Sequence, residues 1–162
     1  MSEADDSDDP GSPSYWRRMF DEASTPFEPE PSQEPAAETL RSLYSHVLRA
    51  YRYRCAMTGR SYAPPVDFLH DHLGIVPIRP LTMGGALHVD NFLCLDSDAG
   101  AAFRSGHIAV GPASELIADL SRIDPELLES LHPLGRLLPP EPGLSQPDRE
   151  ALAFHRSRIF LH

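Results

Sequence analysis

The sequence predicts a mixed α+β domain that follows a disordered acidic N-terminal tail. Apolar residues recur with the helical period over residues 38–52, whereas the later apolar runs are short and are interrupted by proline and glycine. The third observation is the distribution of charge. Residues 1–38 contain eleven of the 24 acidic residues but only two of the 14 basic residues. The tail therefore carries most of the net charge of −10, and the domain predicted over residues 39–162 is nearly neutral.

The tail (residues 1–38) contains six prolines among its acidic residues. Such a segment buries too little apolar surface to offset the entropy lost on ordering, so we expect it to be disordered. A short apolar segment interrupts it at residues 14–20, where one face of a short helix would carry Tyr15, Trp16, Met19 and Phe20. This segment either docks on a protein partner or packs back onto its own domain, and the sequence favours neither.

The domain begins with the best-supported helix, at residues 38–52. Its predicted buried face consists of apolar residues at helical spacing: Leu40, Leu43, Tyr44, Val47, Leu48 and Tyr51. Beyond it we expect a short strand and turn at 55–59, an extended segment at 66–77 and a loop at Gly84-Gly85. Helical segments are then expected at 89–95 and 99–103, followed by a strand at 107–110. The last expected elements are a helix at 126–131, started by Asp124-Pro125, and a helix at 145–158.

Several classes of protein are excluded or disfavoured. No run of apolar residues is long enough to cross a membrane, and the acidic N-terminus lacks the features of a secretory signal. Two cysteines are too few for a disulfide framework or a four-cysteine zinc site, and each has apolar neighbours. We therefore expect a cytoplasmic protein that does not associate with membranes.

Five segments of the domain resemble a known family in their order and spacing. They are RCAMTG (54–59), GIVP (74–77), VDNFLCL (89–95), FRSG (103–106) and IAV (108–110). Together they resemble HNH endonuclease domains of the restriction-endonuclease-like branch, and the resemblance extends to LLP (137–139) and FHR (154–156). It covers roughly residues 40–160 and implies an HNH-like ββα-metal core with flanking helices.

In this family, a histidine on the first strand acts as general base and a second histidine on the helix helps to bind the metal. Placed on this chain, the first histidine position is Gly74 and the second is Gly100, while the motif asparagine is retained as Asn91. Glycine supplies neither a proton acceptor nor a metal ligand. The resemblance therefore implies a catalytically degenerate domain that binds DNA or a protein without cutting, and this interpretation requires no cofactor.

An active, divergent nuclease is the main alternative, and the sequence leaves the question of enzyme activity open. His70, His72 and Gly74 would share one face of an extended strand, so His72 is a candidate substitute for the lost base. His70, His72, Asp96 and Asp98 are the candidate metal ligands, with Asp71 nearby, and the metal would be Mg²⁺ or Mn²⁺. The alternative explanation for the two aspartates is that they cap the following helix.

The candidate nucleic-acid contacts are arginines around the end of the first helix: Arg49, Arg52, Arg54 and Arg60, with Arg79 further along. Positive charge at a helix C-terminus also suits the helix dipole, which is the simpler explanation. Because the domain is nearly neutral, we expect any DNA binding to be weak. A third interpretation is an adaptor that recruits a protein through the Trp16 segment. His155 and Arg156 match the family's closing pair, and we expect His155 to dock the last helix on the core.

Overall fold

The computed structural model describes Trp16 and residues 37–160, and at its centre lie two antiparallel strands, β1 (Leu73–Pro77) and β2 (Phe92–Asp96). Every residue of the pair is buried except Pro77, which is half-buried. The register places Leu73 opposite Asp96, Gly74 opposite Leu95, Ile75 opposite Cys94, Val76 opposite Leu93 and Pro77 opposite Phe92. Burial on both faces explains why neither strand alternates between apolar and polar residues.

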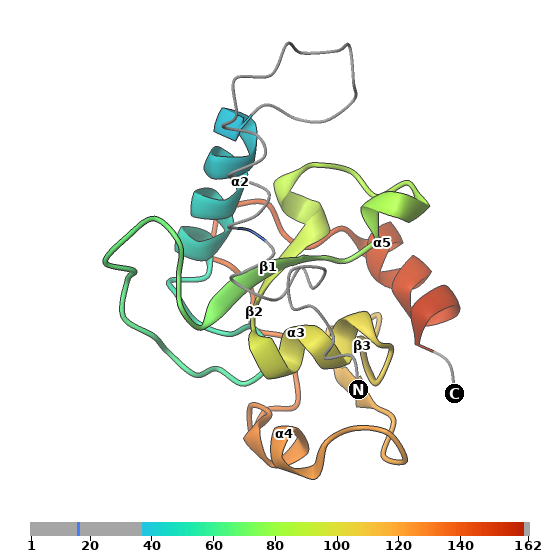
Figure 1. Ribbon diagram of the computed structural model, residues 1–162. Coiled ribbons are helices and arrows are strands. Elements are labelled where there is room, and N and C mark those ends of the chain that lie inside the picture. The colour runs from blue at the N-terminus through green and yellow to red at the C-terminus, as the bar shows by residue number, and fades with distance from the viewer. Residues whose placement is uncertain (1–15, 17–36, 161–162) are drawn as a thin grey trace, which may run out of the picture.

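Two helices pack against this strand pair. Helix α2 (Ala37–Ala50) lies above it in Figure 1, and α3 (Ser97–Arg104) lies below it. The predicted apolar face of α2 is buried as expected, and the chain leaves the helix through Arg52 and Tyr53, both at φ 55°. Helix α3 follows β2 directly, because the Asp96 side chain caps it by accepting a hydrogen bond from the Ala99 amide (2.9 Å).

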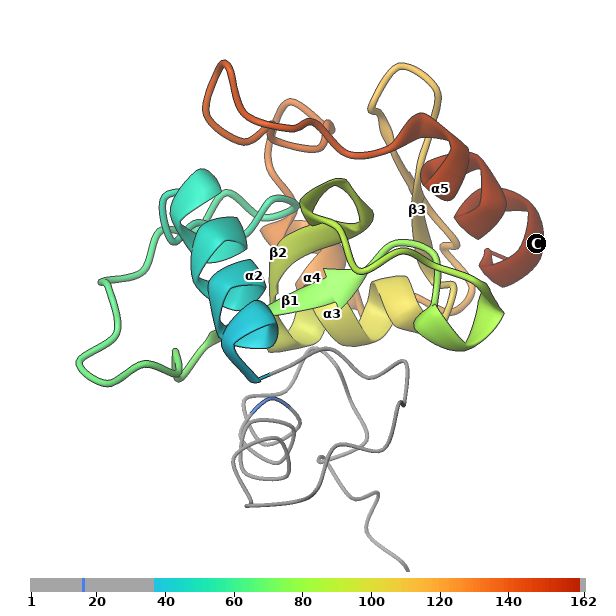
Figure 2. The same ribbon diagram turned by 90° about the horizontal axis from the view of Figure 1, so that it is seen from above.

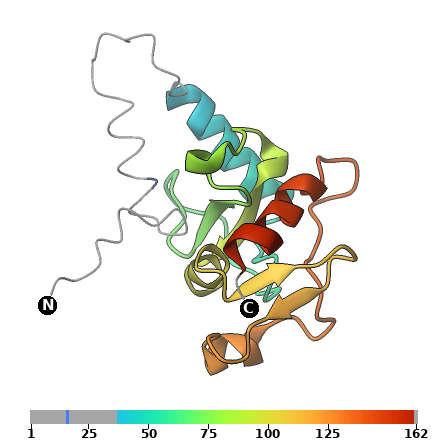
Figure 3. The ribbon, with the colours of Figure 1, turned by 90° about the vertical axis from the view of Figure 1, so that its right-hand side faces the viewer.

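The second half of the domain is built around a smaller antiparallel pair, β3 (Ile108–Val110) and β4 (Leu116–Ala118). Helix α4 (Pro125–Ser130) follows, with Asp124 as its N-cap and proline in its first turn, as the sequence predicts. Helix α5 (Arg149–Phe154) continues into a π-helical turn, His155–Ile159, and lies beside the β3–β4 pair (Figure 3).

Trp16 packs into the core of the domain. Its side chain is 2 % exposed, and its ring lies 5.8 Å from Tyr44 of α2 and 6.5 Å from Phe92 of β2, centroid to centroid. At this residue the structure shows the second of the two arrangements considered for the apolar segment, packing onto its own domain. The rest of residues 1–36, and with it the expected disorder of the tail, lies outside the described residues. Figure 2, which views the domain from above, shows α2 beside β1.

Several sequence-based expectations differ from the structure. The segment 89–95 was expected to be helical, but Phe92–Asp96 is strand β2, because its unbroken apolar run pairs with β1 and is buried on both faces. Extended structure within 66–77 is confined to β1. The expected strand at 55–59 is a turn, closed by a hydrogen bond from the Gly59 amide to the Cys55 carbonyl (2.9 Å).

Two further elements were misjudged. Strand β4 was not predicted, since three apolar residues carry too little pattern to be recognised without their partner β3. The last helix begins at Arg149 rather than near Ser145, because Asp148 is its N-cap and accepts from the Ala151 amide (3.2 Å). The class of the fold is nevertheless mixed α+β, as predicted. Within residues 37–160 no helix combines the length and the apolar character needed to cross a bilayer.

Candidate functional site

The unit β1–β2–α3 brings together the positions on which the family resemblance depends. Gly74 lies in β1 opposite Leu95, and Gly100 lies in α3, which packs against both strands. Both glycines are buried. Neither position presents a side chain that could accept a proton or coordinate a metal.

Asn91 holds the loop between β1 and β2 in place. Its Oδ1 accepts a hydrogen bond from the Arg79 amide (2.9 Å), and its Nδ2 donates to the carbonyls of Arg79 and Ala86 (both 3.0 Å). Gly85 is required beside it, because a Cβ at this position would lie 1.9 Å from the Arg79 carbonyl oxygen. Asn91 is therefore a positioning residue for the loop, and both N–H groups of its side-chain amide are used within it.

His70 uses both ring nitrogens within the domain. Its Nδ1 accepts hydrogen bonds from the amides of His72 and Leu73 (both 3.0 Å), and its Nε2 lies 2.9 Å from the Ala63 carbonyl oxygen. Because a carbonyl only accepts, Nε2 carries the proton and Nδ1 is the acceptor. The ring is 3 % exposed and stacks on Tyr53. A metal ion would have to displace these bonds, so His70 organises the entry into β1.

His72 lies at the surface, in the bend that precedes the first residue of β1. Its ring stacks on Tyr62, with centroids 5.2 Å apart and an interplanar angle of 23°, and lies 6.1 Å from the ring of His70. Asp71 beside it is also exposed. Across Trp16 and residues 37–160, no group of three or more His, Cys, Asp or Glu side chains could hold a metal ion.

The aspartates after β2 serve the start of α3. Asp96 is 7 % exposed, and its Oδ1 caps α3 by accepting a hydrogen bond from the Ala99 amide. Asp98 is exposed in the first turn of the same helix. Both border a cavity of about 150 Å³ that Arg60, Asp124 and Glu126 also line. Neither carboxylate lies with His70 or His72 in a ligand group. The residues present around the unit therefore do not fit the divalent metal that the family resemblance implies.

The two cysteines are buried and chemically inert. Burial raises the pKa of the Cys55 thiol and holds the pKa of Cys94 well above its usual value of 9.0. A thiol with a raised pKa is neutral at neutral pH and is a poor ligand and a poor nucleophile. Both side chains serve as small apolar core residues, as their neighbours in the sequence indicated.

The candidate DNA-contacting arginines differ in the contacts that they already make within the domain. Arg49 lies on the exposed face of α2, next to an open cavity of about 390 Å³ that Arg41 and His46 also line. Arg60 is exposed and hydrogen-bonds to Tyr62. Arg52 pairs with Glu141.

Two arginines are more enclosed. The Nε of Arg54 is buried and has no hydrogen-bond partner within the described part of the chain. Arg79 donates through its Nε to the Met83 carbonyl (2.7 Å), and its guanidinium lies 4.3 Å from the centroid of the Phe154 ring. Arg49 and Arg60 are therefore the exposed members of the set that form no ion pair within the described residues, and of the two Arg60 lies beside a cavity that four carboxylates also line.

Two further histidines, His88 and His155, have structural roles. His88 caps a short 3-10 turn and lies 2.9 Å from a carboxylate oxygen of Asp90. His155 is 2 % exposed, stacks on Phe103 and lies with its Nε2 2.7 Å from the Phe103 carbonyl oxygen, so it docks the last helix on α3. Burial lowers the pKa of His155 from 6.5 to about 4, against the opposing effect of the Phe103 carbonyl.

The partner-binding residues expected in the tail are only partly described. Trp16 is buried in the core, so its indole is not a surface for a partner in this conformation. Tyr15, Met19 and Phe20 lie outside the described residues.

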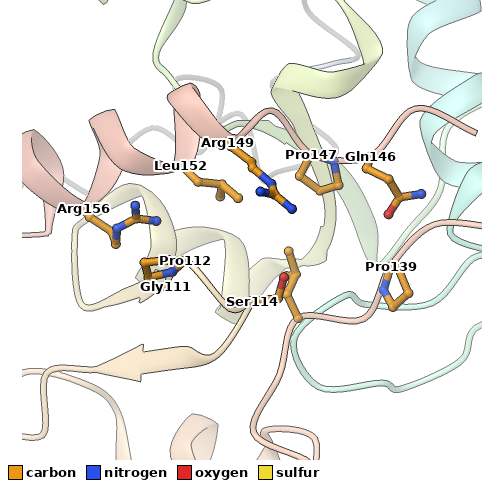
Figure 4. Close-up of a pocket in the computed structure, with 10 residues that line it drawn as sticks. Gly111, Pro112, Ser114, Pro139, Gln146, Pro147, Arg149, Leu152 and Arg156 are labelled. Atoms are coloured by element: carbon orange, nitrogen blue, oxygen red, sulfur yellow. The ribbon is translucent and has the colours of Figure 1, made fainter.

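A cavity beside α5 was not predicted from the sequence. Arg149, Ser114 and Gln146 line it (Figure 4), together with Arg156, which had been considered only as part of the closing pair. A seven-residue spacing of arginines on the last helix was the available signal.

Comparison with known proteins supports the fold at a coarse level. Neither the family models nor the curated proteins contain a match to this sequence. Among solved structures, the chain is similar to one described as "Modification dependent TagI restriction endonuclease", with a TM-score of 0.55 and 21% sequence identity. The match covers 73% of this chain and 37% of that chain. The fold therefore resembles part of a restriction endonuclease, and the chain spans little more than a third of that protein's length.

Proposed function

We propose that this domain is a nuclease-like fold of the HNH type that binds DNA without hydrolysing it. The observation that carries the proposal is the pair of buried glycines, Gly74 in β1 and Gly100 in α3, at the positions where the family resemblance places histidines. The strand–strand–helix order of β1, β2 and α3 supports the same assignment. So does the similarity to a restriction endonuclease.

Phosphodiester hydrolysis needs a base that activates water and a cation that stabilises charge on the leaving oxygen. The nearest substitute for the base, His72, stacks on Tyr62 at the surface, while both nitrogens of His70 are bonded within the domain. Asp96 caps α3. These contacts support loss of catalysis rather than its transfer to neighbouring side chains.

The proposed DNA-binding surface is the arginine segment, which we define as residues 39–66. It contains five arginines and no acidic residue: Arg41, Arg49, Arg52, Arg54 and Arg60. Guanidinium groups bind phosphate oxygens in bidentate geometry, which suits contacts to the DNA backbone. Because the rest of the domain, residues 67–162, has seven arginines against thirteen acidic residues, we expect weak binding that depends strongly on salt.

Fluorescence anisotropy of a labelled duplex tests whether this surface binds DNA. The titrations run from 50 to 200 mM salt, about the range over which phosphate contacts are lost. The test variant is Arg49→Gln with Arg60→Gln, and the control is Arg136→Gln with Arg158→Gln, which removes equal charge from exposed positions elsewhere. We expect the test variant to bind more weakly and to lower the slope of log K against log salt by roughly two.

The control pair should bind as the unmodified protein does. No binding by the unmodified chain at low salt would contradict the proposal, and so would equal losses in the two variants. Far-UV circular dichroism of both variants would show whether a loss of binding reflects a loss of fold.

A further inference from the structure

A cavity of about 300 Å³ lies between α5, the turn that joins β3 to β4, and the proline-rich crossing at 137–147 (Figure 4). This volume lies at the lower end of the range for small-molecule pockets. The cavity shares no residue with the arginine segment, so what it binds is a separate question from the proposed DNA contact.

Two arginines give the cavity its polarity. Arg149 and Arg156 lie seven residues apart on α5 and its π-helical continuation, and both line the same space. Arg149 is exposed, and the ion pairs formed within residues 37–160 do not include it. In Figure 4 its guanidinium extends toward the middle of the lining residues, above Ser114.

A hydrogen bond to the backbone holds the Arg156 side chain in place. Its Nη1 donates a hydrogen bond to the Val110 carbonyl (2.7 Å), which fixes the side chain against the end of β3 and leaves its other N–H groups for a ligand. A guanidinium fixed in this way loses little rotamer entropy when it binds an anion. The Ser114 hydroxyl and the Gln146 amide, also at the cavity, add uncharged hydrogen-bonding groups.

No acidic residue lines the cavity, but two carboxylates lie close to residues that do. The Glu115 carboxylate lies against Gly111 and is turned to the backbone, where its Oε2 accepts from the Ala113 amide (2.8 Å). Asp148 lies between Pro147 and Arg149 in the sequence, and its Oδ2 caps α5 by accepting from the Ala151 amide (3.2 Å). Both carboxylates are engaged with backbone amides, whereas both guanidinium groups line the space, so the cavity favours an anion.

The other walls are apolar. Three proline rings, Pro112, Pro139 and Pro147, line the cavity together with Leu137 and Leu152. Such walls suit a planar ring more than a bare inorganic ion. The ligand that matches both sets of walls has an anionic head and a flat body.

We infer that this cavity binds a nucleoside 5′-phosphate, with the phosphate monoester between Arg149 and Arg156 and the nucleoside against the proline walls. A phosphate monoester carries close to two negative charges and three acceptor oxygens, which two guanidinium groups can share. The same chemistry exists in a free mononucleotide and in the 5′-phosphorylated end of a nucleic-acid strand.

Isothermal titration calorimetry of the full chain tests the inference, with adenosine 5′-monophosphate, adenosine and inorganic phosphate as probes. We expect the monophosphate to bind at least about tenfold more tightly than either fragment, a difference of about 1.4 kcal/mol. Arg149→Gln should weaken its binding by about tenfold or more. Arg158→Gln, an exposed change on the same element but outside the cavity, should not.

Short strands with and without a 5′-phosphate identify the source of the ligand. In the Arg49→Gln, Arg60→Gln variant, tighter binding of the phosphorylated strand than of both the unphosphorylated strand and the free mononucleotide assigns the site to strand ends. Tighter binding of the free mononucleotide than of the phosphorylated strand assigns it to mononucleotides. Three results would overturn the inference: no heat at millimolar probe, equal affinity for adenosine and its monophosphate, or full affinity in Arg149→Gln. The Arg49→Gln, Arg60→Gln variant should keep its affinity for the monophosphate. Failure of the DNA-binding proposal and failure of this inference would therefore give different results.

Discussion

Asn91 and Arg79 bind one another in both directions across the loop between β1 and β2. The Arg79 amide donates to Asn91 Oδ1 (2.9 Å), and Asn91 Nδ2 donates to the Arg79 carbonyl (3.0 Å). The Ile78 amide adds a bond to the Asn91 carbonyl (2.7 Å). Asn91 therefore holds the loop, whereas Gly74 and Gly100, where the family resemblance implies histidines, carry no side chain.

Replacing Asn91 with alanine should destabilise the domain. The change removes three side-chain hydrogen bonds and leaves the buried groups of the loop without partners, so we expect a loss of about 2–4 kcal/mol in the free energy of unfolding. Urea denaturation followed by circular dichroism measures it. A loss below about 0.5 kcal/mol, the scale of an ordinary surface substitution, would show that the loop does not depend on Asn91.

The buried His155 should make stability depend on pH. Its pKa is about 4 in the folded domain and near 6.5 when unfolded, so between these values the unfolded chain binds the additional proton. Stability should therefore be insensitive to this group above pH 6.5. It should then fall by roughly 3 kcal/mol as the pH drops to about 4.

Urea denaturation midpoints measure this dependence from pH 7 to pH 4, about the window set by the two pKa values. The reference is His155→Leu, which removes the titrating group. The difference between the two proteins should grow in favour of the leucine variant as the pH falls. Parallel curves would show that His155 is accessible to solvent or already charged in the folded domain.

Gly106 permits close contact between the end of α3 and the C-terminal segment. It has φ +76°, and a Cβ there would lie 2.0 Å from the Ile159 carbonyl oxygen. Gly135 has a similar φ of +64° but nothing within 4 Å of its Cβ position, so it is a matched control. Gly135→Ala should cost about 1 kcal/mol, from the left-handed backbone alone.

Gly106→Ala carries the same backbone cost together with a clash against backbone, and we expect about 3 kcal/mol or more in total. Thermal and urea unfolding of the two variants compares them directly. Equal losses would mean that the C-terminal segment does not pack on Gly106 as the structure has it.

Trp16 is the single tryptophan of the chain, so its fluorescence reports its environment without interference. Because it is buried against Tyr44 and Phe92, its emission should be blue-shifted, resist quenching by acrylamide, and shift to the red in urea. Trp16→Ala should destabilise the domain by about 3–5 kcal/mol. Emission typical of an exposed indole would instead show that Trp16 is free to bind a partner, as the adaptor interpretation requires.

The parts of the fold that the sequence predicted are those with strong local signals. The period of apolar residues marked α2, and the Asp124-Pro125 pair marked the start of α4. Strand β2 was taken for a helix because an apolar run that is buried on both faces has no period of its own. Strand β4 depends wholly on pairing with β3, which local sequence does not encode.

The site was harder to predict than the fold. The sequence placed Gly74, Gly100 and Asn91 in the unit β1–β2–α3, but it could not show that both nitrogens of His70 are used by nearby backbone. Nor could it show that Asp96 is occupied as a helix cap, although that explanation had been considered. The cavity at Arg149 joins segments distant along the chain, and only tertiary structure brings them together.

Incubation of the purified protein with supercoiled plasmid in Mg²⁺ or Mn²⁺ tests the central claim most directly. A native gel would report binding as retarded mobility and cleavage as nicked or linear product. We predict retarded plasmid that returns to the fully supercoiled form once the protein is removed. Nicked or linear product that disappears in His72→Ala would contradict the claim, and would identify His72 as the base of a working nuclease.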